Sequence, residues 1–71
     1  MKAAEAKAVR IVAGRSTEQL VTMFEMTETM DGENIPTVRG WIMDELEHRD
    51  PEAFDKWLDS MEDSPRRFYA A

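Results

Sequence analysis

The chain has 71 residues with nine Lys or Arg and fifteen Asp or Glu, which gives a formal net charge of −6. A chain of this length forms one small domain at most, because it hides only about 60% of the surface that the unfolded chain exposes. It contains no cysteine, which excludes disulfides and thiolate metal sites.

The acidic charge and its distribution also restrict the partners of the chain. The basic residues are scattered rather than gathered into one patch, so direct binding to nucleic acid is disfavoured. Charged residues interrupt the N-terminal 15 residues, which leaves no uninterrupted apolar stretch for a signal peptide. No segment of the sequence approaches the roughly 20 apolar residues of a membrane span. We therefore expect a soluble cytoplasmic protein that contacts neither nucleic acid nor membrane.

The first segment, residues 1–15, is an alanine-rich arm. Its composition favours a helix over residues 2–13, although Val9, Ile11 and Val12 also fit a short strand. Gly14 is a suitable helix stop, because glycine adopts the left-handed conformation at little cost.

A second helix start follows at Ser16, whose hydroxyl can cap a helix while Gln19 reaches back to the Ser16 amide. The next apolar residues recur at helical spacing and predict an amphipathic helix over about 17–30. The residues at this spacing are Leu20, Met23, Phe24, Thr27 and Met30, with Val21 and Met26 on the flanks. Asp31 and Gly32 then favour a turn.

Asn34 and Pro36 predict the start of a third helix over 35–49, with Asn34 as cap and proline in the first turn. One face of this helix is apolar: it carries Val38, Ile42 and Leu46, with Trp41 and Met43 at its edges.

Glu45 and Arg49 lie beside that face, four residues apart in the favourable order for a helix ion pair. Partial burial there would require the two charges to pair. Gly40 leaves its side of the helix free of bulk, so another group could approach it closely.

Asp50 and Pro51 end the third helix and start a fourth over about 51–62, because proline disfavours the helical conformation of the residue before it. The fourth helix has a regular apolar stripe of Phe54, Trp57, Leu58 and Met61. Ser64 and Pro65 stop it. Residues 63–71 form a tail without periodicity, for which disorder and docking on the body are both open.

These elements predict an all-α fold, in which residues 1–71 form a single domain with an arm (1–15), a helical core (16–62) and a tail (63–71). The core is a small bundle of three amphipathic helices, and the N-terminal helix packs on it or on a partner. The predicted interior consists of Leu20, Phe24, Val38, Ile42, Leu46, Phe54, Trp57 and Leu58.

The second and third helices spread apolar groups over more of their circumference than a monomer of this size covers easily. Contiguous exposed apolar patches usually mark interfaces. We therefore predict a homodimer, or docking on another protein, through an interface that includes Met26, Met30, Trp41 and Met43.

Three stretches of the chain carry a resemblance to known proteins. They are STEQLVTMFEMT (16–27), TVRGWIMDELE (37–47) and RDPEAFDKWLD (49–59). Together they resemble a group of small proteins encoded in phages and prophages of Gram-positive bacteria. The resemblance covers about residues 16–59. It implies a bacterial or phage cytosolic origin and a helical fold, and it brings no catalytic residues.

The candidate chemistry is weak. Glu45 and His48 have the Glu-x-x-His spacing of carboxylate metal bundles, and Glu25 or Glu28 could be added as ligands. A solvated histidine near the helix end is the favoured interpretation. There is no cysteine nucleophile, one histidine and no Gly-rich phosphate loop, so we predict no enzyme, no catalytic residue and no cofactor.

A helix-turn-helix that binds DNA is also disfavoured, because the fourth helix carries the acidic residues Glu52, Asp55 and Asp59, which would repel the phosphates.

The leading hypothesis is a non-catalytic interaction or regulatory protein of phage or prophage origin, whose acidic surface could imitate nucleic acid on a basic partner. The alternatives are a structural component of a virion and a carboxylate and histidine metal-binding bundle.

Overall fold

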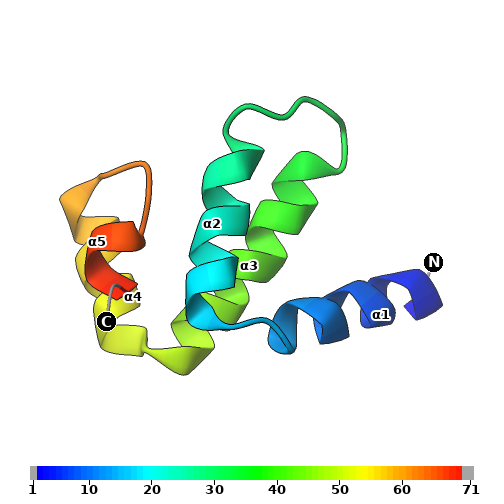
Figure 1. The fold of residues 1–71 in the computed structure, drawn as a ribbon, viewed down its shortest axis with the longest axis horizontal. Coiled ribbons are helices and arrows are strands. Elements are labelled where there is room, and N and C mark those ends of the chain that lie inside the picture. Colours follow the sequence, from blue (N-terminus) through cyan, green and yellow to red (C-terminus); the bar gives the residue numbers. More distant parts are fainter. Residues whose placement is uncertain (1, 70–71) are drawn as a thin grey trace.

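The computed structural model describes residues 2–69, with side chains from Ala6 onward. Over this range the chain is all-α and has no strand (Figure 1). The helices are α1 (Lys2–Ala13), α2 (Thr17–Thr27), α3 (Ile35–Arg49), α4 (Pro51–Ser60) and α5 (Arg66–Tyr69). The all-α prediction is confirmed, and the N-terminal segment forms a helix rather than a strand.

Two of the three predicted helix caps are present. The Gln19 amide donates to Ser16 Oγ at 3.1 Å, and the Ser16 amide donates to Gln19 Oε1 at 2.9 Å, which completes the capping box. The Ala53 amide donates to Asp50 Oδ1 at 3.1 Å and caps α4.

The predicted Asn34 cap is wrong. Asn34 has φ −90° and ψ −9°, a helical rather than extended conformation, and within the described residues its side chain caps no amide. The Ile35 amide instead donates to the Gly32 carbonyl at 3.3 Å, and Pro36 has no amide to cap. The turn before α3 therefore replaces the side-chain cap.

Helices α2 and α4 end earlier than predicted. After Thr27, the amides of Glu28, Thr29 and Met30 donate to carbonyls three residues earlier, so the chain tightens instead of continuing α2 to residue 30. Helix α4 ends at Ser60 because Met61 takes the left-handed conformation at φ 61°. Met61 is 89% exposed and does not extend the predicted apolar stripe.

The core lies between α2, α3 and α4 and includes one residue of α1. Its buried cluster consists of Val12, Leu20, Val21, Phe24, Ile42, Leu46, Phe54 and Trp57. The Trp57 ring meets Phe24 and Phe54 edge to face, at centroid distances of 5.2 and 5.7 Å.

The predicted interior differs from this cluster at its edges. Val38 is only half-buried, and Leu58 is exposed, so its assignment to the interior is wrong. Helix α4 turns Ala53 inward together with Phe54 and Trp57, which rotates Leu58 toward solvent. Val12 and Val21 are buried although the sequence did not predict it.

Helices α2 and α3 form an antiparallel hairpin, α4 and α5 lie together beside it, and α1 extends away from the body (Figure 1). Helix α5 packs on α2 and α4. The Tyr69 hydroxyl donates to the Leu46 carbonyl at 2.8 Å, and the Arg66 guanidinium binds the Glu25 carboxylate at 2.7 Å. The tail therefore docks as far as Tyr69, whereas Ala70 and Ala71 lie outside the described residues.

Candidate protein-binding surface

A shallow apolar groove of about 150 Å³ runs between α2 and α3. Its walls are formed by Met23, Met26, Thr27, Met30, Val38 and Ile42. Met26 and Met30 are 53% and 45% exposed. Large apolar side chains with this exposure, beside a depression, are typical of a surface that another apolar group covers. We call this depression the methionine groove.

The polar group of Thr27 is satisfied inside the protein, which keeps the methionine groove apolar. The Thr27 hydroxyl donates to the Phe24 carbonyl at 2.5 Å and accepts from Arg39 Nη1 at 2.8 Å. The Arg39 guanidinium lies 4.2 Å from the centroid of the Phe24 ring. Arg39 is thus engaged by the core, and its charge is held against α2 by a hydrogen bond and a cation–π contact.

A second depression, of about 120 Å³, lies where α1 meets α3. It is lined by Val9, Val12, Trp41, Asp44 and Glu45. Trp41 is half-buried there. A methyl group added at the neighbouring Gly40 would meet no atom of the described residues within 4 Å, so this outer side of α3 is open.

The predicted interface residues are distributed over different parts of the surface. Met26 and Met30 share the methionine groove, and Trp41 lines the α1–α3 depression. Met43 follows Trp41 by two positions, which places it about 160° away around α3, where it is half-buried against the core. Whether these residues contact a partner stays a prediction.

The predicted interface did not include all of the residues that line these surfaces. Val38 was assigned to the interior but forms a wall of the groove, and Val9 joins Trp41 across two helices. The spacing of Met23, Met26 and Met30 on one flank of the predicted helix 17–30 is the signal that could have located the groove.

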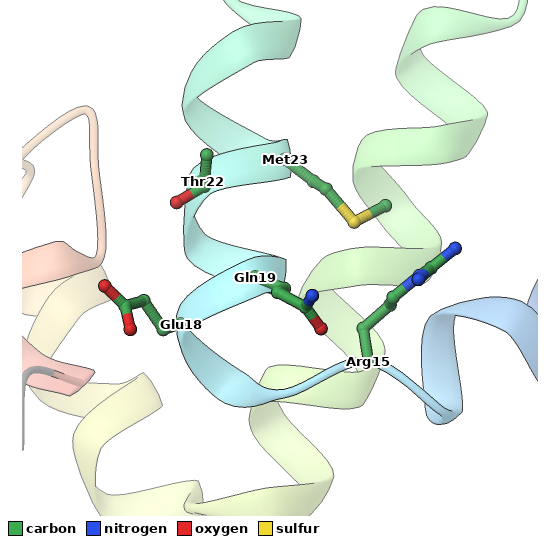
Figure 2. Close-up of a pocket in the computed structure, with 5 residues that line it drawn as sticks. All are labelled: Arg15, Glu18, Gln19, Thr22 and Met23. Carbon is green, nitrogen blue, oxygen red and sulfur yellow. The ribbon is translucent and has the colours of Figure 1, made fainter.

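The outer face of α2 bears a broader and more polar depression of about 450 Å³ (Figure 2). Glu18 and Arg15 point in opposite directions, the carboxylate toward α4 and α5 and the guanidinium toward α1 and α3. The Gln19 side chain already accepts a hydrogen bond from the Ser16 amide. The charged groups do not converge, so this depression offers no arrangement for acid and base catalysis.

Charge is divided unevenly along the chain. Residues 1–15 contain four basic and one acidic residue (+3), and residues 16–71 contain five basic and fourteen acidic residues (−9), which together give −6. The loop that joins α2 to α3 begins next to the methionine groove and carries Glu28, Asp31 and Glu33 without a basic residue. The end of the groove at Met30 is therefore flanked by negative charge.

Two glutamates of the metal hypothesis, Glu25 and Glu45, are paired with arginines. Glu45 Oε2 accepts from Arg49 Nε at 2.8 Å, so the predicted ion pair is present. His48 is exposed. Among the described residues, no three His, Asp or Glu side chains are grouped as metal ligands. Glu45 would have to leave Arg49 to bind a metal.

Comparison with protein-family models, with curated proteins and with solved structures finds no match for this chain. Of the helices formed by residues 2–69, none combines the length and the apolar character that crossing a membrane requires.

Proposed function

We propose that this chain is a non-catalytic protein that acts by binding other proteins, and that it binds a second copy of itself. The observation that carries the proposal is the exposure of Met26 and Met30 beside an apolar groove. A small domain gains stability from association, because its own core buries little surface. Covering these side chains would add apolar burial that the monomer lacks.

The chemistry of the methionine groove suits a helix as ligand. Methionine side chains are flexible and fit irregular apolar surfaces, and helices dock in such grooves through residues three and four positions apart. The acidic loop 28–34 at one end favours a helix with positive charge. The preferred ligand of this groove is thus an apolar helix with a basic face.

A basic surface on a host protein is the second candidate partner. Glu52, Asp55 and Asp59 are all exposed on α4, beside the exposed Leu58. The resemblance of residues 16–59 to small phage and prophage proteins implies a bacterial or phage cytosolic origin, and such a partner would then be a protein of the bacterial host. Binding that is insensitive to salt would contradict an electrostatic mode of docking.

Sedimentation velocity at micromolar concentration tests self-association. We expect a dimer, and a monomer over the whole concentration range would refute self-association. Species larger than a dimer would favour the alternative of a structural component of a virion.

A matched pair of variants identifies the surface. Met30→Glu places a charge in the methionine groove and should abolish the dimer, because the interface would have to bury that charge. Met61→Glu makes the same change at a side chain that is 89% exposed and outside the groove, and it should leave the dimer intact. Equal effects of the two substitutions would contradict the assignment.

A further inference from the structure

Helix α1 carries apolar side chains that its own chain leaves open to solvent. Among its described side chains, Val12 is the buried one, whereas Val9 and Ile11 are 44% and 46% exposed. The helix leaves the body at an angle and extends beyond the α2–α3 hairpin (Figure 1). A helix of 12 residues is marginal in water without packing, so α1 requires a surface to cover it.

Arg49 fixes the direction of α1. Its Nη2 atom donates to the carbonyls of Ala13 and Arg15 at 3.0 and 2.6 Å, and its Nη1 atom donates to Thr17 Oγ1 at 3.2 Å. If α1 turned back onto the methionine groove of its own chain, these bonds would break and Val12 would leave the core. Packing on another molecule requires neither change.

The chain itself contains the kind of helix that the methionine groove favours. Helix α1 has three basic residues and one acidic residue, a charge of +2, whereas the rest of the chain has six basic and fourteen acidic residues, a charge of −8. Lys7 and Arg10 are exposed on α1, and Asp31 and Glu33 are exposed in the loop beside the groove. Opposite charges on two surfaces direct their association and oppose pairing of like with like.

We propose that two copies of this chain associate by exchanging α1, so that the α1 helix of each copy packs on the methionine groove of the other. Ile11 is the apolar anchor, and Lys7 and Arg10 lie toward the acidic loop of the partner. The arrangement is symmetric, because each chain gives one helix and receives one. This inference rests on the proposed self-association and specifies which surfaces form it.

A charge exchange between two variants tests the pairing. The first variant carries Lys7→Glu and Arg10→Glu and has an acidic α1 beside an unchanged acidic loop. The second carries Asp31→Lys and Glu33→Lys and has a basic loop beside an unchanged basic α1. All four positions are exposed, so both variants should keep the fold, which circular dichroism checks.

At low salt, the dimer of each variant alone should have a dissociation constant at least about tenfold higher than that of the unmodified chain. The reason is that like charges then meet in both halves of the dimer. An equimolar mixture should form a heterodimer, since both exchanged contacts regain opposite charges. Asp55→Lys with Asp59→Lys on α4 makes the same charge change away from the groove and should leave the dimer unchanged. Ile11→Glu should dissociate it at any salt concentration.

The outcomes separate the two proposals. If the unmodified chain is a monomer, self-association and helix exchange are both refuted. If the unmodified chain is a dimer and the two charge variants dimerise equally well, self-association stands and the exchange is wrong. If both variants are monomers and their mixture is also a monomer, α1 does not pair with the loop of a second copy, and the exchange is refuted.

Discussion

The Nη2 atom of Arg49 lies 3.0 Å from the carbonyl oxygen of Ala13, so the last turn of α3 holds the end of α1. The same guanidinium binds Glu45 within α3 and Thr17 at the start of α2. One side chain thus joins three helices and satisfies backbone carbonyls where α1 ends.

Arg49→Lys should therefore destabilise the protein although the positive charge is kept. Lysine lacks the planar fork that reaches several acceptors at once, and the loss should lower the free energy of unfolding by about 1–3 kcal/mol. Urea unfolding measures this. His48→Gln, at the exposed neighbouring position, should change the free energy by no more than about 0.5 kcal/mol. An unchanged midpoint for Arg49→Lys would show that the three-helix connection is dispensable.

The two tryptophans should respond differently to truncation. Trp57 is buried between Phe24 and Phe54, and its indole N–H donates to the Glu62 carbonyl at 2.8 Å. Trp57→Ala should lower the free energy of unfolding by about 3–5 kcal/mol. Trp41→Ala, at a half-buried position that lines the α1–α3 depression, should lower the free energy of unfolding by less. Equal losses of stability, measured by urea unfolding, would contradict this distinction.

Acid should release α5 from α2. Hydrogen bonds from Arg66 and Ser64 lower the pKa of Glu25 from 4.5 to about 2. Because this pKa is lower in the folded state, the contact stabilises the fold above pH 4.5 and is lost as the pH falls toward 2. The amide resonances of Arg66 and Phe68 should shift over this range, and Glu25→Gln should remove most of that shift. Glu28→Gln, beyond the end of α2, serves as control and should leave the shift in place.

Alkali should act on α5 through Tyr69. Burial and the charges of Asp50 and Glu47 raise the pKa of Tyr69 from 10.0 to about 12. The stabilising effect of the neutral hydroxyl is present below pH 10 and is lost as the pH rises toward 12. Tyr69→Phe should be less stable than the unmodified chain near neutral pH, because its bond to Leu46 is missing. The difference between the two proteins in urea unfolding should shrink at alkaline pH, and a constant difference would argue against ionisation of Tyr69.

Local signals were sufficient to predict where α1 to α4 start and both bounds of α3. Pro51 and the Asp50 cap act within a few residues, so the sequence alone locates the junction of α3 and α4. The ends of α2 and α4 were predicted too late, because the apolar spacing continues through Met30 and Met61 after the backbone has turned. Periodicity reports which residue types recur and does not report where the helix stops.

The docking of the tail, the burial of Val12 and the shape of the methionine groove depend on tertiary contacts. Arg66 and Glu25 are 41 positions apart, and no local pattern in the tail predicts their pairing. Val12 is buried because Arg49 holds the end of α1 against the body. The exposure of Met26 and Met30 was predictable, because the predicted helix 17–30 spreads apolar residues over more than half of its circumference. The shape of the methionine groove depends on how α2 and α3 pack together, which the sequence pattern does not determine.

The junction at Asp50 leaves no spacer between α3 and α4. The Asp50 amide donates to the Leu46 carbonyl at the end of α3, and its carboxylate caps the first turn of α4. One inserted residue would separate these two bonds, so that the junction would no longer hold α4 in the position that packs Trp57 against Phe24. In the loop 28–34, no single residue both ends one helix and caps the next. Added length in this loop therefore costs little closure entropy. Natural variation in chain length should therefore be found between α2 and α3 and be absent at Asp50.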